Sequence, residues 1–259
     1  MSAEQDSKTP GGKSSTKSKI DYVEYRYVFA FPKGDRKEFL IRLDPETLEY
    51  VRESQSPPPE WARLGFSQCE GCPLGSSKEY CPVAVNLDDV VSTFRDKDSF
   101  EQVEVTVETA QRSYEKTVAL QKGISSLLGI LMSTSNCPIM DNLRPMTRFH
   151  LPFATAMETF YRMISMYITA QFLRTRKGLP PDWELKNLLE IYKQVASVNK
   201  GISRRLVDAS TKDANANAVV ILHSFGDGIS FFVESGLEDI EGMFRQYLSS
   251  GDGAPRESG

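Results

Sequence analysis

The chain has 259 residues, of which 40% are hydrophobic and 25% are charged, and its formal net charge at pH 7 is −4. A chain of this length buries a self-sufficient core, as one large domain or two small ones. The acidic balance argues against nucleic acid as the main partner, because phosphate binding needs a basic field. No apolar run approaches the roughly 20 residues that cross a bilayer, and the N-terminus lacks the apolar core of a secretory signal. We therefore expect a cytoplasmic protein with no membrane partner.

Both ends of the chain are predicted to be disordered. Residues 1–19 and 249–259 consist mostly of small and polar side chains. Such segments bury too little apolar surface to offset the entropy of ordering. The folded part is therefore expected between residues 20 and 248.

Two β-hairpins are predicted in the first half of the folded part. In each, apolar side chains alternate with polar ones on either side of a polar turn. The alternating apolar positions are Val23, Tyr25, Tyr27, Phe29, Phe31, Phe39, Ile41 and Leu43 in the first hairpin, and Val103, Val105, Val107, Tyr114 and Val118 in the second. Together they predict an antiparallel sheet of about four strands, whose apolar face needs a cover.

Helical periodicity replaces the alternation after Gly123. Helices are predicted near residues 123–135, 156–176, 185–206, 213–225 and 236–248, with a shorter helix or capped turn at 86–94. Thr155 and Glu158 form a capping box that opens the second of these helices. Its predicted core stripe is Met157, Phe160, Ile164, Tyr167, Ile168 and Phe172. The sequence thus predicts an α+β fold, with a β-rich domain at 20–121, a Cys-rich insertion at 55–100 and a helical domain at 122–248.

The strongest chemical signal is the set of four cysteines, Cys69, Cys72, Cys81 and Cys137. In the cytoplasm cysteines stay reduced, so a cluster indicates metal binding or catalysis before disulfides. The Cys69-x2-Cys72 knuckle presents two thiolates on one turn, and the Gly- and Ser-containing stretch after it lets Cys81 reach the same ion. Cys137 would complete a tetrahedral set and tie the insertion to the helical half.

The identity of the metal stays open at this point. Structural zinc is favoured by the four-thiolate set. An iron–sulfur cluster is the alternative, because Cys72, Cys81 and Cys137 are each followed by proline, as cysteines beside such clusters often are. Cysteines without a metal are the third reading, in which Cys137 is a small buried hydrophobe.

A second candidate site lies between residues 136 and 153, where Arg144, Arg148 and His150 fall close together before a helix N-terminus. Arginine forks and helix N-termini both favour anions, so this stretch is an anion-site candidate, with His150 as metal ligand or general base in variant readings. In the competing structural reading, the arginines pair with acids such as Asp141 and Glu158 and join the two halves.

Weaker signals add little to these candidates. His223 and Asp227 are four residues apart on a predicted helix, so they share a face, but a lone pair of this kind is usually structural. The chain contains no Walker loop, no G-x-G-x-x-G, no H-E-x-x-H and no nucleophile elbow.

Three stretches carry a family resemblance: "CEGCPL…CPVAVNL", "GISSLLGILMSTSNCPIMDNLRPMTRFHLPFAT" and "DANANAVVILHSF". With them, most of residues 20–245 resembles a family of uncharacterised bacterial proteins that share CxxCP…CPVA and NCPxMDxLRPMxRFHLPFA motifs. The resemblance implies a bacterial cytoplasmic protein with an α+β fold and a shared Cys/His region. It implies no activity.

The leading functional hypothesis is a non-enzymatic metal-binding protein with a regulatory, adaptor or scaffolding role and an unknown protein partner. The alternative is a metal- or iron–sulfur-dependent enzyme or redox sensor, with its site at Cys137, Arg144, Arg148 and His150. A third hypothesis is a sensor of a small anion that works through the arginines.

Overall fold

The computed structural model describes residues 21–53, 56–75 and 78–249. The predicted disordered termini lie outside these residues, apart from Ser249. The described chain has an N-terminal antiparallel sheet followed by a set of helices, so the predicted α+β fold is confirmed.

One antiparallel sheet holds both predicted hairpins. Its strands are β1 (Val23–Ala30), β2 (Arg36–Leu43), β3 (Gln102–Glu108) and β4 (Ser113–Ala119), in the order β2-β1-β3-β4. Tyr27 and Phe29 on β1 are fully buried on the apolar face. On the opposite face, Arg26 pairs with Glu38 at 2.5 Å and with Glu108 at 2.6 Å. The alternation in the sequence therefore sorts the two faces as expected.

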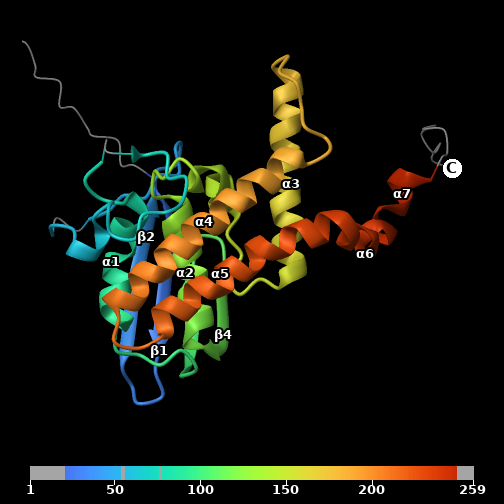
Figure 1. The fold of residues 1–259 in the computed structure, drawn as a ribbon. Helices are drawn as coiled ribbons and strands as arrows, with labels where there is room; N and C mark the ends of the chain where they lie inside the picture. Colours follow the sequence, from blue (N-terminus) through green and yellow to red (C-terminus); the bar gives the residue numbers. More distant parts are fainter. Residues whose placement is uncertain (1–20, 54–55, 76–77, 250–259) are drawn as a thin grey trace, which may run out of the picture.

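Helices cover the apolar face in two layers (Figure 1). The inner layer is α1 (Pro82–Phe94) and α2 (Leu120–Ser133), and the outer layer is α4 (Lys186–Ala209) and α5 (Ala214–Phe231). The helix α2 lies in the middle, with ten of its 14 residues buried. The expected domain boundary at 121/122 falls inside this helix, and a single apolar core runs across it.

The helix α1 is longer than predicted. It begins at Pro82, directly after Cys81 as its N-cap, with the proline in the first turn, where a missing N–H costs nothing. The Cys-rich run was predicted to stay in a loop as far as the helix near residue 86. Its last cysteine instead starts a buried helix.

The helix α3 (Ala156–Arg176) begins at the predicted capping box. The Thr155 N–H donates to Glu158 Oε2 at 2.7 Å, and the Glu158 N–H donates to Thr155 Oγ1 at 3.3 Å. Its predicted core stripe is partly wrong, because Met157, Ile168 and Phe172 are 37%, 36% and 56% exposed. Figure 1 shows the reason: α3 stands out from the body, so the other helices cover only one edge of it.

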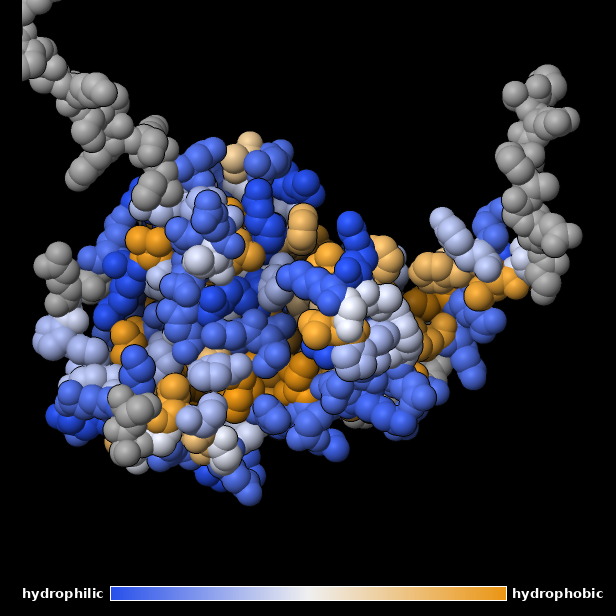
Figure 2. Space-filling view, turned by 90° about the horizontal axis from the view of Figure 1, so that it is seen from above, coloured by the Kyte–Doolittle hydropathy of each residue, from blue (hydrophilic) through white to orange (hydrophobic). Residues whose placement is uncertain are grey.

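The remaining elements are short. They are the 3-10 helices η1 (Glu60–Ala62), η3 (Met140–Phe149) and η5 (Gly242–Phe244), the π-helix η4 (Phe232–Gly236), and the helices α6 (Leu237–Glu241) and α7 (Arg245–Leu248). From η4 onward the chain forms an arm that leaves the body (Figures 1 and 2). Large apolar side chains on this arm are exposed, among them Met243 at 75% and Tyr247 at 84%.

The contact between α2 and the sheet depends on Gly123. A Cβ added there would lie 2.8 Å from Phe29 Cε1 and 2.9 Å from Val105 Cγ2, closer than carbon atoms tolerate. Gly129, two turns later on the same helix, has Leu222 Cδ2 as its nearest neighbour at 3.8 Å. Alanine at position 123 therefore tests the packing of α2 against the sheet, whereas alanine at position 129 tests mainly the helix propensity.

We expect Gly123→Ala to lower the free energy of unfolding by about 1–3 kcal/mol, because overpacking displaces core side chains. Gly129→Ala should be neutral or stabilising by up to about 1 kcal/mol, because alanine favours the helix. Urea unfolding of both variants measures this. An equal change in the free energy of unfolding at both positions would contradict the close approach of Gly123 to Phe29 and Val105.

Candidate functional site

Each of the four cysteines is held by the local backbone. Cys69 and Cys72 share a tight turn, in which the Cys72 N–H donates to the Cys69 carbonyl at 3.2 Å. Cys81 caps α1, and its N–H donates to the Ala62 carbonyl at 2.8 Å. Cys137 lies just before η3, where its carbonyl accepts from the Asp141 N–H at 2.9 Å. Two cysteines thus stand at helix starts and two on a turn.

The four thiols come together in the fold. Burial, with smaller contributions from Cys81, Cys72 and Cys137, raises the pKa of Cys69 to about 12. Burial likewise raises the pKa of Cys137, with smaller contributions of the same sign from Cys81 and Cys72. Such mutual effects require neighbouring groups, since the interaction between charges weakens with distance. The residues predicted as one set are therefore close together.

Their side chains do not converge on a common point. Among the described residues, no three His, Cys, Asp or Glu side chains are arranged to hold a metal ion. Cys69 Sγ instead faces α4, 4.0 Å from the Val198 carbonyl oxygen, at the place where Gly201 leaves room for it. The four cysteines therefore share one region of the fold, where the described residues form no set of metal ligands, and the metal site stays a prediction.

Backbone N–H groups point at two of the sulfurs. The N–H groups of Ala84 and Val83 reach Cys81 and lower its pKa, although burial raises it more. Those of Met140 and Ile139 act in the same way on Cys137. Helix starts favour negative charge, so these N–H groups offset part of the cost that burial imposes on a thiolate at both positions.

A buried arginine lies beside this cluster. Arg205, on α4, is 0% exposed and donates to the carbonyls of Trp61, Arg63 and Leu64 at 2.6–2.9 Å. Its Nε has no hydrogen-bond partner among the described residues. Burial lowers its pKa, while Cys81, Cys69 and Cys72 raise it, and no carboxylate contributes. Its positive charge therefore has thiols as its only ionisable neighbours in the described part of the chain.

Arg205 was missed at the level of sequence, although a signal existed. It lies in phase with Val198, Ile202 and Leu206 on the buried stripe of α4. A charged residue in such a stripe is unusual, because burying an unpaired charge is costly. That position should have marked Arg205 as a candidate partner of the cysteines.

The fold separates the three residues predicted as an anion site. Arg144 pairs with Asp141, donates to Asn136 Oδ1 at 2.7 Å and approaches Glu49 at 3.5 Å. This is the arrangement of the competing structural reading. Arg148 is exposed. Only His150 faces the interior.

His150 is bound to the sheet and to α2. Its Nε2 lies 2.6 Å from the Tyr27 hydroxyl and 3.3 Å from Ser126 Oγ. Burial, with a smaller contribution from Arg162, lowers the pKa of His150 from 6.5 to about 3. The imidazole is therefore neutral across the physiological range, and its Nε2 has Tyr27 and Ser126 as polar partners.

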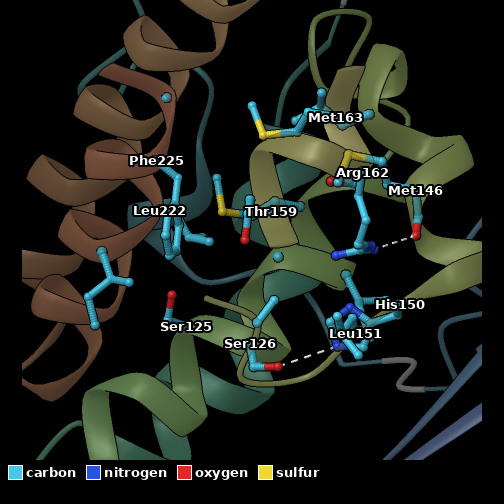
Figure 3. A pocket seen from close by; sticks show the side chains of 18 of the residues that line it. Ser125, Ser126, Met146, His150, Leu151, Thr159, Arg162, Met163, Leu222 and Phe225 are labelled. Carbon is cyan, nitrogen blue, oxygen red and sulfur yellow. Dashed lines mark hydrogen bonds between the residues drawn. The ribbon is translucent and has the colours of Figure 1, made fainter. Parts of the chain in front are cut away.

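A cavity of about 460 Å³ opens beside His150, between β4, α2, η3, α3, α4 and α5 (Figure 3). Its wall includes Arg162, Lys116 and Lys122 but no aspartate or glutamate. Arg162 extends from α3 toward His150 and donates to the Met146 and Phe149 carbonyls at 3.2 and 2.9 Å. The cavity was not predicted, because its walls come from segments far apart in sequence.

The last predicted pair, His223 and Asp227, lies on α5 with a separation of 3.4 Å. Their side chains are 38% and 62% exposed. Exposed pairs contribute little to stability. Their proximity follows from the helix alone.

The low pKa of His150 predicts a loss of stability in acid. Below about pH 6.5 the unfolded chain protonates this imidazole while the folded protein does not, so the free energy of unfolding falls until about pH 3. The slope attributable to one group is at most about 1.4 kcal/mol per pH unit. His150→Gln should therefore flatten the profile between pH 6.5 and 4.

Urea unfolding at several pH values tests this, because the slope does not depend on the absolute stability of the variant. His223→Gln removes the other histidine of the chain and serves as the matched control, which should keep the wild-type slope. A His150→Gln profile parallel to that of the wild type would contradict the assignment.

One helical segment meets the length and composition of a membrane span. It is Ala214–Glu234, with 35% of its most apolar window buried, and the described residues contain one such segment. The sequence was expected to contain none, because scattered polar residues interrupt the apolar run. A core helix of a soluble protein also meets this criterion, so the cytoplasmic location and the absence of a membrane partner stay predictions.

Comparisons with known proteins give a family and no function. Neither the curated proteins nor the solved structures contain a match to this chain. A family model described as a domain of unknown function (DUF6901) matches residues 23–245. This range covers both the sheet and the helices, including all four cysteines. The chain therefore belongs to the DUF6901 family, in agreement with its predicted resemblance to an uncharacterised family.

Proposed function

We propose that this is a non-enzymatic metal-binding protein, in which Cys69, Cys72, Cys81 and Cys137 hold one structural zinc ion. The observation that carries the proposal is the position of Arg205, a buried cation without a carboxylate partner among the described residues, near Cys69, Cys72 and Cys81, with Cys137 in the same region. Its cellular role would be regulatory, adaptor or scaffolding, in the cytoplasm of a bacterium and through a protein partner.

Charge balance supports a metal over free thiols. With the pKa of Cys69 near 12, neutral thiols would leave Arg205 as an uncompensated buried charge. Zinc binds cysteine as thiolate, so four ligands and Zn²⁺ carry a net charge of about −2. Arg205 would offset part of that charge. The two groups therefore stabilise each other only in the metal-bound state.

The positions of the ligands suit a structural role. They come from the loop after η1, the start of α1 and the segment between α2 and η3, so a shared ion would crosslink three parts of the chain. Ligation requires Cys69 Sγ to turn away from Val198 and Gly201 toward the other sulfurs. Such a rearrangement on metal binding is usual, since a preformed site is rare without the ion.

The enzyme alternative finds less support. It needs Cys137, Arg144, Arg148 and His150 in one site, whereas Arg144 is paired with Asp141, Arg148 is exposed and His150 is bound to Tyr27. An iron–sulfur cluster on the same four cysteines stays an outcome of the metal test, because the ligand set would be identical.

Protein purified without oxygen should contain about one zinc per chain and be colourless, whereas a brown colour would indicate an iron–sulfur cluster. Chelation should unfold the protein, since structural zinc contributes on the order of 10 kcal/mol in small domains. Cys81→Ser and Cys137→Ser should lose the metal. Elemental analysis and thermal unfolding measure these outcomes.

Ser135→Ala is the matched control for Cys137→Ser. Ser135 is buried two residues before Cys137 and bonds only the Met132 carbonyl, at 2.7 Å. This variant should keep its metal. A folded wild-type protein without metal and with four freely reacting thiols would overturn the proposal.

Arg205→Gln tests the charge argument separately. If Arg205 stabilises the thiolates, the variant should lose zinc to a chelator with an affinity about 10- to 100-fold weaker than that of the wild type. Arg204→Gln removes the same charge from the neighbouring exposed position and should leave zinc affinity unchanged. If the Arg205→Gln variant is less stable but binds zinc as tightly as the wild type, the charge argument is wrong. Arg205 would then contribute only its hydrogen bonds to the backbone carbonyls.

A further inference from the structure

The cavity beside His150 has the size and position of a ligand site. Its volume of about 460 Å³ lies within the range of small-molecule pockets. It is formed by different residues from the cysteine cluster and is independent of the proposed metal. Figure 3 shows side chains from α2, α3 and α5 directed into it from three sides.

The cavity is elongated along one stripe of α2. Lys122, Ser126, Gly129 and Ser133 all line it, on successive turns of that helix. Residues 122 and 133 are eleven positions apart, which corresponds to about 16 Å along a helix axis. The wall formed by α2 therefore offers an occupant about 16 Å of length.

Positive charge gathers at one end. Lys122 is one turn from Ser126, which bonds His150, and Arg162 lies close enough to lower the pKa of that imidazole. Lys116 is near this end too, since it lowers the pKa of Glu158 together with Arg162. With His150 neutral and no acid in the lining, this end attracts an anion.

Arg162 is placed to bind a carboxylate. It is partly buried, and only its Nη2 donates to the Met146 and Phe149 carbonyls, which leaves the rest of the guanidinium toward the cavity. No salt-bridge partner lies within reach among the described residues. Glu158, the carboxylate that most affects its pKa, is held by the Thr155 N–H at 2.7 Å.

The rest of the wall is mostly apolar. Ile130 from α2, Met163 from α3, Val195 from α4, and Leu222 and Phe225 from α5 form the middle. Asn199 of α4 also lines the cavity, and its Oδ1 is buried without a hydrogen-bond partner in the described residues. Such an orphaned acceptor is costly unless a ligand or water donates to it.

We propose that this cavity binds an elongated organic anion, with one carboxylate at Arg162, Lys122 and Lys116 and an unbranched apolar body along α2. This is the chemistry of a medium-chain fatty acid. The apolar middle of the wall disfavours a second charged group, and the cationic end disfavours a positive head group.

The test is titration calorimetry of the full-length protein, as purified, with dodecanoate below its micelle concentration. Hexanoate should bind more than about 100-fold more weakly, because each buried methylene contributes to affinity. Dodecyltrimethylammonium has the same chain with a positive head group and should not bind. Equal binding of the cationic amphiphile would overturn the proposal.

Two variants place the ligand. Arg162→Gln should weaken dodecanoate binding about 10- to 100-fold, the effect of losing a charge-assisted hydrogen bond. Gly129→Met should abolish binding by filling the channel, while Gly129→Ala, with room for its methyl group, should retain it. Arg148→Gln is the matched charge control, because Arg148 is exposed and does not line the cavity.

Circular dichroism and thermal unfolding without ligand establish that each variant is folded. If Arg162→Gln and Gly129→Met bind dodecanoate as the wild type does, the fatty acid adsorbs elsewhere, for example on the exposed arm that carries Met243 and Tyr247, and the proposal fails. If Arg148→Gln alone loses binding, the anion binds at the segment before α3 and outside the cavity. That result would also overturn the proposal.

Discussion

The close approach of α2 to the sheet at Gly123 is the contact on which the rest of the structure depends. With no side chain at that position, the helix lies directly against Phe29 and Val105. One side of α2 then completes the core of the sheet, and the other side carries α5 and the cavity. Its C-terminal end leads the chain to Cys137, next to the cysteines of the earlier loop. Both candidate sites are thus positioned by one buried helix.

Each candidate site contains an arginine, Arg205 or Arg162, whose charge has no acidic partner among the described residues. Arg205 and Arg162 both donate to backbone carbonyls, and neither has a salt-bridge partner among the described residues. Carbonyl oxygens satisfy N–H groups but do not neutralise a charge. A buried or half-buried cation of this kind favours an anionic neighbour. Thiolates around a metal would supply it at Arg205, and a ligand carboxylate would supply it at Arg162.

Both arginines lie on long helices that join distant parts of the chain. Arg205 bonds α4 to the segment around η1, more than 140 residues earlier. Arg162 bonds the start of α3 to η3. A ligand at either site would therefore affect the packing of the segments that these arginines join, in addition to the charge at the site. The family name adds no function to this picture, so the chemistry of the two sites is the available guide.

The sequence by itself determined the strands and most of the helices. Alternating residues such as Tyr25, Tyr27 and Phe29 sort onto one face because a strand has a period of two, and the capping box at Thr155 satisfies its own backbone groups locally. These are short-range effects, which a linear pattern records. The face of α3 that would be buried was misjudged, because burial depends on neighbours that the helix itself does not encode.

Only the tertiary structure decided which charged residues face the interior. Arg144, Arg148 and His150 are close in sequence, yet one is paired with acids, one is exposed and one is buried against Tyr27. Arg162 and Arg205 looked like ordinary helix residues until the packing of α3 and α4 enclosed them. The cavity has walls from six elements, including β4, so its shape and its charge exist only after those elements meet. Long-range packing sets the desolvation of a side chain, and desolvation is what turns these arginines into candidate binding groups.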